Sequence, residues 1–332
     1  MSALFDVTAI GNAIVDVIAP APEAFLTENA LDKGAMMLID EAQAERLYAR
    51  MAAGIETSGG SAGNTVAGVA SLGGKAVYIG KVADDLLGKV FAHDMRAIGA
   101  KFETSPLVGG AATARSLINV TPDGQRTMCT FLGASTELTA EDVDPAVIEG
   151  ASIVYLEGYL FDPPQARQAF AKAAGLARAA GRMISLTLSD SFVVERHRAG
   201  LLAFIEAEVD LLFANEAEIT SLFETSDFDA ATRAVRGLCK IAAVTRSEQG
   251  SVVLTADETH AVPAFPVDSV IDTTGAGDQY AAGFMFGLAR GRPLPECARL
   301  GSLAASEVIS HYGPRPQAVL AELAAAQNLA TA

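Results

Sequence analysis

Short apolar segments alternate along the chain with longer stretches in which apolar residues recur every three or four positions. The segments that predict buried strands are Val7–Ile10, Ala76–Ile79, Ile153–Leu156, Met183–Leu188, Leu211–Ala214, Ile241–Thr245 and Ser251–Leu254. Helical spacing characterises the stretches between them, such as Gln165–Ala180 and Asp229–Leu238. Strands that alternate with helices predict parallel pairing with helices on both faces of the sheet. The pattern therefore predicts an α/β fold, doubly wound around a mostly parallel sheet.

Two regions, around residues 14–39 and 102–131, break this alternation. They contain short strand-like pieces and turns, and Thr121–Gly124 (Thr-Pro-Asp-Gly) is a strong turn signal. Such insertions are compatible with a small β flap, or lid, over an active cleft, and equally with edge strands that have no moving role. We expect residues 1–332 to form one domain that carries this lid, with an Ala-rich helix over Ala318–Ala332.

Charge and cysteine content narrow the classes of function. The chain has 24 basic and 40 acidic residues, and a net charge of −16 disfavours nucleic acid as a partner. Its three cysteines are far apart, which argues against a disulfide framework. Neither a membrane-spanning segment nor a secretory leader is indicated. We expect a cytoplasmic monomer or homodimer that acts on small molecules.

The most informative segment is Asp272-Thr-Thr-Gly-Ala-Gly-Asp278, which precedes a stretch of small and apolar residues typical of a packed helix. With Thr274 as the expected N-cap, the backbone amides of Gly275, Ala276 and Gly277 would form an anion site at the helix start. Asp278 would lie beside that anion, where a carboxylate can take a proton from an attacking hydroxyl. The competing interpretation is an ordinary capping acid in the first turn.

A second group of polar residues lies near the N-terminus. Asn12 and Asp16 follow the first predicted strand, at the sheet edge where ligands bind in open α/β folds. Gly60 and Asn64 belong to Ser58-Gly-Gly-Ser-Ala-Gly-Asn64, which opens a helix. Glycine allows close approach of a ligand, and the amide and carboxylate side chains can bind hydroxyl groups. A plain Gly-rich turn with an Asn cap is the alternative.

Taken in order, these segments resemble motifs of the ribokinase-like (PfkB) carbohydrate and nucleoside kinases, and the resemblance extends over nearly the whole chain. The matching segments are Gly11–Asp16, Gly59–Asn64, Gly80–Gly88, Asn215–Glu218 and Asp272–Asp278. Within the family the sequence is most similar to adenosine kinases, on the basis of Gly11–Asp16 and Gly124–Ala134.

The resemblance implies roles for these residues. Asp278 matches the catalytic base, and Gly275, Ala276 and Gly277 match the anion hole for the transferred phosphate. The positions that hold the hydroxyls of the acceptor are matched by Asn12, Asp16, Gly60, Ser61 and Asn64. Arg126 matches an arginine that closes over the phosphates from the flap, although an exposed turn arginine is an equal alternative, and Arg115 is a lesser candidate.

The cofactors that the resemblance implies are ATP and Mg²⁺, with K⁺ as a further possibility. Glu218, together with Asn215, matches the motif that helps to hold Mg²⁺ through water. Asp272 and the Thr274 carbonyl, with the loop near Gly313, match the place where some members bind K⁺.

The nucleotide-binding loop departs from the family pattern. Thr245–Gly250 lies where Thr-x-Gly-x-x-Gly is common in the family, and Ser247 replaces the first glycine. This replacement leaves the local backbone conformation open.

Tyr159 has two equal interpretations. It offers a stacking surface for the base of a nucleoside, or it is a core residue.

The expected function is ATP-dependent phosphorylation of a ribonucleoside 5′-hydroxyl, with adenosine the favoured acceptor and AMP the product, as in purine salvage. The alternatives are a sugar kinase of the same family, acting on ribose, fructose or 2-keto-3-deoxygluconate, and a catalytically silent nucleoside-binding protein.

Overall fold

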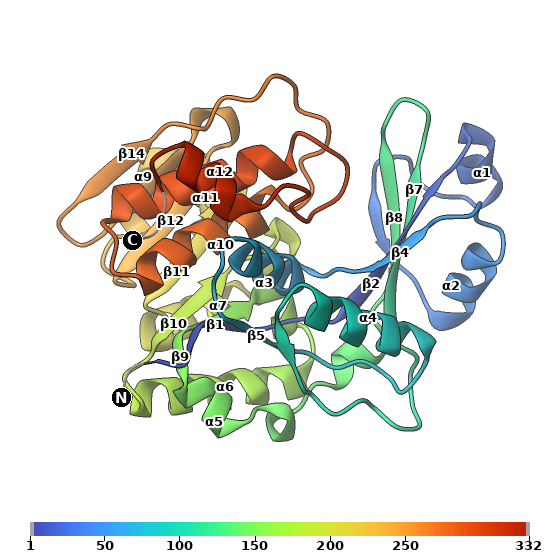
Figure 1. Cartoon of the computed structure of the whole chain (residues 1–332), viewed down its shortest axis with the longest axis horizontal. Coiled ribbons are helices and arrows are strands. Elements are labelled where there is room, and N and C mark those ends of the chain that lie inside the picture. Colours follow the sequence, from blue (N-terminus) through green and yellow to red (C-terminus); the bar gives the residue numbers. More distant parts are fainter. Residues whose placement is uncertain (1–2, 330–332) are drawn as a thin grey trace.

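A nine-stranded sheet forms the larger part of the molecule (Figure 1). The computed structural model describes residues 3–329. The strands are, in spatial order, β14 (Thr259–Val262), β13 (Ser251–Leu254), β12 (Ile241–Thr245), β11 (Leu211–Asn215), β10 (Met183–Thr187), β9 (Ala151–Glu157), β1 (Phe5–Ile10), β5 (Ala76–Ile79) and β6 (Lys101–Phe102). Neighbouring strands from β12 to β6 pair in parallel, whereas β13 and β14 pair antiparallel. The predicted doubly wound α/β fold is confirmed.

Helices cover both faces of this sheet, as Figure 1 shows. One face packs against α3 (Ser61–Ser71), α4 (Leu86–Ala97), α10 (Ala276–Ala289) and α11 (Leu294–Val308). The other face packs against α5 (Pro145–Glu149), α6 (Pro164–Ala179), α7 (Ser191–Glu208), α8 (Glu216–Leu222) and α9 (Phe228–Val235). Strand β9 shows why both faces are apolar: Val154 and Leu156 enter one core, and Ile153 and Tyr155 enter the other.

A second, five-stranded sheet, here called the lid sheet, lies at one end of the body (Figure 1). Its order is β3 (Met36–Leu38), β8 (Arg126–Phe131), β7 (Ala114–Val120), β2 (Ile14–Pro20) and β4 (Ile55–Ser58). The helices α1 (Glu23–Glu28) and α2 (Glu41–Tyr48) accompany it. Residues 121–124 form the turn between β7 and β8, where Gly124 has φ 81°.

The lid sheet differs in extent from the two predicted insertions. Strand β4 lies outside both of them, because a four-residue segment with exposed Ile55 gives no periodic signal. Phe102 belongs instead to β6 in the main sheet. The assignment of residues 1–332 to one domain with a closing lid stays a prediction.

The C-terminal helix α12 (Leu320–Ala326) packs on α11 and is shorter than the predicted helical tail, of which residues 330–332 lie outside the described part. Among the residues that the structure describes, no helix combines the length and apolar character needed to cross a bilayer.

Candidate active site

The carboxyl edge of the main sheet gathers polar residues from separate strands. Asn12 follows β1, Glu157 ends β9, Asn215 ends β11 and Thr245 ends β12. Asn215 and Thr245 are neighbours in register. The lid sheet starts from this same edge, because β2 begins two residues after Asn12. This is the edge at which open α/β sheets bind ligands.

Asp278 is the residue that joins the two predicted motifs. Its carboxylate accepts a hydrogen bond from the Ser61 hydroxyl at 2.6 Å and another from the Asn64 side-chain amide at 3.0 Å. Burial raises the pKa of Asp278 to about 6, and these two hydrogen bonds oppose that rise. A carboxylate of this pKa is ionised at neutral pH and still basic enough to accept a proton.

The helix start beside Asp278 differs from the prediction in one residue. Thr274 is not the N-cap, because its hydroxyl donates to Asp272 Oδ1 at 2.7 Å and the helix begins one residue later. Gly275 is the N-cap, with φ 81°, and a Cβ there would lie 2.6 Å from the Pro314 carbonyl oxygen. That left-handed conformation, tight against Pro314, excludes threonine.

At this start the amides of Gly277 and Asp278 are open to a ligand, whereas the Ala276 amide, which the sequence also placed in the anion site, is already bonded. Ala276 N–H donates to the Thr273 carbonyl at 3.2 Å, and the first intrahelical bond is from Gln279 N–H to the Gly275 carbonyl. Among the described residues, no acceptor contacts the amides of Gly277 and Asp278. Two free donors at the positive end of a 14-residue helix favour an anion.

Arg126 and Asp272, predicted for separate roles, are in contact. Arg126 Nη2 on β8 lies 2.5 Å from Asp272 Oδ2, and both side chains are more than nine-tenths buried. Arg126 Nη1 also donates to the Thr274 hydroxyl at 3.4 Å. Arg126 is therefore not an exposed turn residue, and it connects the lid sheet to the segment before α10.

Asp16 on β2 lies on the lid side of the site. Its carboxylate is adjacent to Gly59, where a Cβ would come within 2.3 Å of Oδ2. Gly60 has φ 81° and lies against the Asn12 carbonyl. Burial raises the pKa of Asp16 to about 7, against the lowering effect of Arg315 and Arg126. Within residues 3–329 no hydrogen bond to the Asp16 carboxylate is formed, so both oxygens can accept from a ligand.

Glu157 is a site residue that the sequence did not reveal. It is 1% exposed and accepts hydrogen bonds from the backbone amides of Asn12 and Ala62 and from the Asn12 side chain. It thus joins the end of β1 to the start of α3. Burial raises its pKa to about 7. Because Glu157 is the last residue of an apolar strand and belongs to no recognised motif, the sequence pattern did not identify it as a site residue.

Arg315 is the second residue that the sequence did not reveal. Its guanidinium donates to the Ser58 hydroxyl at 2.6 Å and to Asn64 Oδ1 at 3.5 Å. Burial lowers the pKa of Arg315, and the nearby carboxylates of Asp16 and Asp94 oppose this. A lone arginine in a Gly- and Pro-containing loop has no pattern that would identify it.

Glu218 and Asn215 form a capping box at the start of α8. Each side chain bonds the backbone amide of the other, at 3.0 and 2.8 Å. Burial, together with the charges of Asp190 and Asp278, raises the pKa of Glu218 to about 7, against the lowering effect of the hydrogen bond from the Asn215 amide. No group of three or more metal-binding side chains is found in the described part of the chain. A lone carboxylate that lacks a cationic partner fits Mg²⁺ held mainly by water and phosphate.

The loop of Thr245, Ser247 and Gly250 turns from β12 into β13. Ser247 has φ 49°, so it adopts the left-handed conformation that its family glycine would take without strain. Gly250 has φ 85°, and a Cβ there would lie 2.1 Å from the Val262 carbonyl oxygen. The replacement of glycine by Ser247 thus keeps the shape of the loop at a local cost.

Replacing Ser247 by glycine should raise the free energy of unfolding by about 0.5–1 kcal/mol, because relief of the left-handed strain outweighs the added freedom of the unfolded chain. Denaturant unfolding measures this. Ser247→Ala is the control: it removes an exposed hydroxyl and keeps the strain, so its stability should not rise. An equal gain in both variants would contradict this account.

Tyr159 lies in the short 3₁₀ segment Gly158–Phe161 and is half-buried against the core beneath α6 and α7. Its hydroxyl donates to the Ser189 carbonyl at 3.4 Å. A stacking role for Tyr159 stays a prediction.

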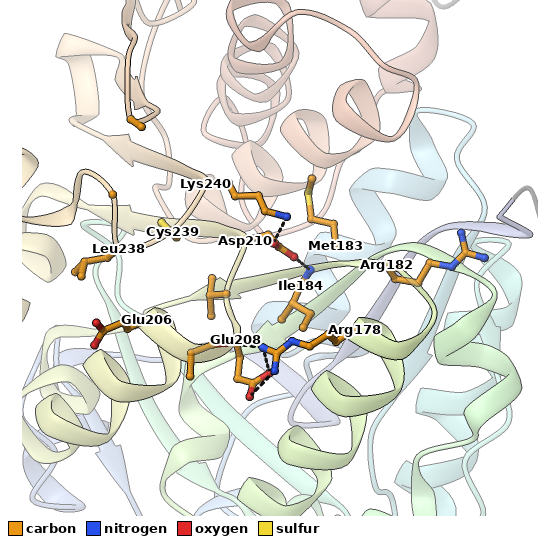
Figure 2. A pocket seen from close by; sticks show the side chains of 15 residues that line it. Arg178, Arg182, Met183, Ile184, Glu206, Glu208, Asp210, Leu238, Cys239 and Lys240 are labelled. Carbon is orange, nitrogen blue, oxygen red and sulfur yellow. Dashed lines mark hydrogen bonds and ion pairs between the residues drawn. The ribbon is translucent and has the colours of Figure 1, made fainter.

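A pocket of about 730 Å³ lies at the opposite, amino edge of β10, β11 and β12 (Figure 2). Four of its charged side chains form two ion pairs: Lys240 with Asp210 at 2.7 Å, and Arg178 with Glu208. The Asp210 carboxylate also accepts the Ile184 amide at 2.8 Å. This pocket is separate from the carboxyl edge and holds none of the predicted site residues.

Comparison with known proteins agrees with this geometry. The model of the pfkB family carbohydrate kinases matches residues 34–319. An adenosine kinase from Sinorhizobium meliloti has 54% identity and a TM-score of 0.92, covering 98% of this chain and 100% of that chain. A probable sugar kinase protein from Rhizobium etli CFN 42 has 50% identity and a TM-score of 0.93, covering 98% and 99%. The adenosine kinase of Saccharomyces cerevisiae is 25% identical over 92% of this chain and 95% of its own length.

These matches confirm the resemblance that the motifs indicated, including the ribokinase-like fold. The chain therefore belongs to the pfkB family of carbohydrate kinases, and it is a phosphotransferase with an alcohol group as acceptor.

Proposed function

We propose that the enzyme transfers the γ-phosphoryl group of ATP to the 5′-hydroxyl of adenosine, giving AMP and ADP. The observation that carries the proposal is the position of Asp278. It is ionisable near neutral pH, bonded to Ser61 and Asn64, and lies in the first turn of α10, where the Gly277 and Asp278 amides are free. Support for adenosine comes from the 54% identity to a protein named adenosine kinase.

Each residue has a defined part in this reaction. Ser61 and Asn64 fix the Asp278 carboxylate, which accepts the proton of the attacking hydroxyl. The amides of Gly277 and Asp278 meet the negative charge on the transferred phosphoryl group at the α10 N-terminus. Asp16 and Asn12 would hold the ribose hydroxyls, and Glu157 fixes the Asn12 side chain through a hydrogen bond of 3.0 Å. The lid sheet would exclude water, which otherwise competes as the acceptor.

We also propose that Glu218, with Asn215, holds Mg²⁺ through water at the nucleotide phosphates. Bound there, the ion would neutralise phosphate charge. Within residues 3–329 no basic side chain forms an ion pair with the Glu218 carboxylate, which supports this assignment. Thr245, Ser247 and Gly250 would line the nucleotide side of the same edge.

The second candidate is a sugar kinase, favoured by the 50% identity to a protein named probable sugar kinase. The rate of ADP formation with MgATP and adenosine, cytidine, ribose, fructose or 2-keto-3-deoxygluconate separates the two. We expect kcat/KM to be highest for adenosine. A higher value for any free sugar than for every nucleoside would favour the sugar kinase, and no acceptor-dependent ADP would favour a silent binding protein.

Activity should rise with pH across the range in which Asp278 and Asp16 ionise. Burial raises their pKa values to about 6 and about 7, and the base must be ionised to accept a proton. The acid limb of kcat/KM should therefore have its midpoint between about 6 and 7. A pH profile at constant ionic strength measures it. A midpoint near 4, the ordinary value for a carboxyl group, would contradict the proposed environment.

A role in purine salvage follows from this reaction. The three free cysteines and the use of ATP support a cytoplasmic location.

A further inference from the structure

The ion pair between Arg126 and Asp272 lies where the family resemblance implied a K⁺ site. The carboxylate of Asp272 is surrounded by donors from the protein itself. Oδ1 accepts from the Thr274 amide at 3.1 Å and the Thr274 hydroxyl at 2.7 Å. Oδ2 accepts from the Gly313 amide at 3.0 Å and lies 2.5 Å from Arg126 Nη2.

These contacts already give the Asp272 carboxylate a cationic partner in the place where a metal ion would lie. A carboxylate has about four lone-pair sites. Three hydrogen bonds occupy sites on Asp272, and the guanidinium of Arg126 lies against Oδ2 as an ion pair. Three carbonyls around the site each accept one hydrogen bond: that of Thr273 from Ala276, that of Ile309 from Ile271, and that of Pro314 from Gln279. A second positive charge beside the buried guanidinium would be repelled. The residues present therefore do not fit a bound K⁺.

The guanidinium of Arg126 supplies what a bound cation would supply at this site: a buried positive charge that holds neighbouring segments together. Arg126 comes from β8 of the lid sheet and is 92% buried, since 8% of its side chain is exposed. It also lies over the Tyr312 ring, 5.7 Å from the centroid, within the loop that contributes the Gly313 amide. One charged group thus joins three segments: the lid sheet, the loop at residues 312–313 and the segment just before α10.

We infer that Arg126 replaces the monovalent cation at Asp272, so that phosphoryl transfer by this enzyme does not require K⁺. Arg126 is in this sense a positioning residue: through Asp272 it holds Thr274 and Gly313 and thereby sets the start of α10, where the free amides lie. The inference rests on the proposed phosphotransferase reaction and goes beyond it, because it assigns the cation requirement.

The test compares monovalent cations at fixed ionic strength. ADP formation and thermal unfolding are measured in KCl, NaCl and tetramethylammonium chloride, with Mg²⁺ constant. The wild type should show rates within twofold in the three salts and equal melting temperatures. Arg126→Met, which removes the charge and keeps much of the bulk, should be slower in tetramethylammonium and be stimulated by K⁺ about fivefold or more. Its melting temperature should be higher in KCl than in tetramethylammonium chloride.

Two further variants make the result specific. Arg126→Met combined with Asp272→Ala should lose the response to K⁺, because the carboxylate that would bind the ion is gone. Arg115→Met removes a positive charge from the neighbouring strand β7 and should leave the enzyme indifferent to K⁺. If Arg126→Met fails to fold, the inference is tested by the wild type in the three salts and by Arg126→Lys. The lysine ammonium should keep the rate of ADP formation independent of K⁺.

Stimulation of the wild type by K⁺ of fivefold or more, with a melting temperature raised only in KCl, would overturn the inference. So would an Arg126→Met variant that folds and shows no response to K⁺. If no acceptor gives ADP in any salt, the proposed function fails, whereas the melting temperatures still report whether K⁺ binds.

Discussion

Replacing Asp278 by asparagine should lower kcat by on the order of 10²–10⁴, because the change is nearly isosteric and removes the proton acceptor. The amide can still accept from Asn64 and donate to the Ser61 hydroxyl, so the local hydrogen bonds are kept. The fold should be retained. Steady-state kinetics with MgATP and the preferred acceptor measures the loss, and thermal unfolding shows whether the variant is folded.

Stability separates this role from ordinary helix capping. Burial raises the pKa of Asp278 to about 6, so its ionised form opposes folding as the pH rises through that value. At pH 8 the neutral amide should therefore not lower the melting temperature. The matched control is Asp229→Asn, which removes an exposed first-turn acid from α9 and should leave kcat unchanged. A kcat for Asp278→Asn within threefold of the wild type would rule out the base, and loss of folding would favour capping.

Replacing Asp16 by alanine should remove most activity on adenosine. The carboxylate is 8% exposed and has no hydrogen-bond donor within residues 3–329, so a ribose with its 2′- and 3′-hydroxyls supplies the missing donors. Leaving such a buried group unpaired costs roughly 1–3 kcal/mol, about ten- to a hundredfold in specificity. The wild type should therefore use 2′-deoxyadenosine with a kcat/KM lower by that factor.

The measurement is the ratio of kcat/KM for adenosine to that for 2′-deoxyadenosine in both proteins. In Asp16→Ala the ratio should fall to about threefold or less, because neither nucleoside then has a carboxylate to satisfy. Asp16→Asn, which keeps one acceptor oxygen, should be intermediate. An undiminished preference for adenosine in Asp16→Ala would place the recognition of the 2′-hydroxyl elsewhere.

The body of the fold could be predicted because burial on both faces leaves a continuous apolar run. Strands β5, β12 and β13 have the bounds that the apolar pattern predicts. Strand β4 was not predicted because it is short and half exposed, and its place is set by pairing with β2 rather than by its own composition. Helix α10 begins at Ala276 for a similar reason: contact with Pro314 fixes Gly275 as the cap, and no local pattern shows that contact.

In the site, residues within motifs could be found and residues outside them could not. Asn64 and Asp278 were identified from their motifs and Ser61 from the family resemblance, and the structure places all three within hydrogen-bond distance. Glu157 and Arg315 act through contacts with segments about 95 and 257 residues away in sequence, which no spacing rule encodes. The contact between Arg126 and Asp272 was missed for the same reason, although each residue was singled out separately.

The most direct test of the account is the identity and amount of product when the enzyme is incubated with MgATP and adenosine. Chromatography with mass detection should show adenosine 5′-monophosphate and ADP formed in equal amounts, with neither formed by Asp278→Asn above about 1% of the wild-type rate. ADP formed without a phosphorylated nucleoside, or phosphorylation of ribose or fructose in preference to adenosine, would contradict the account.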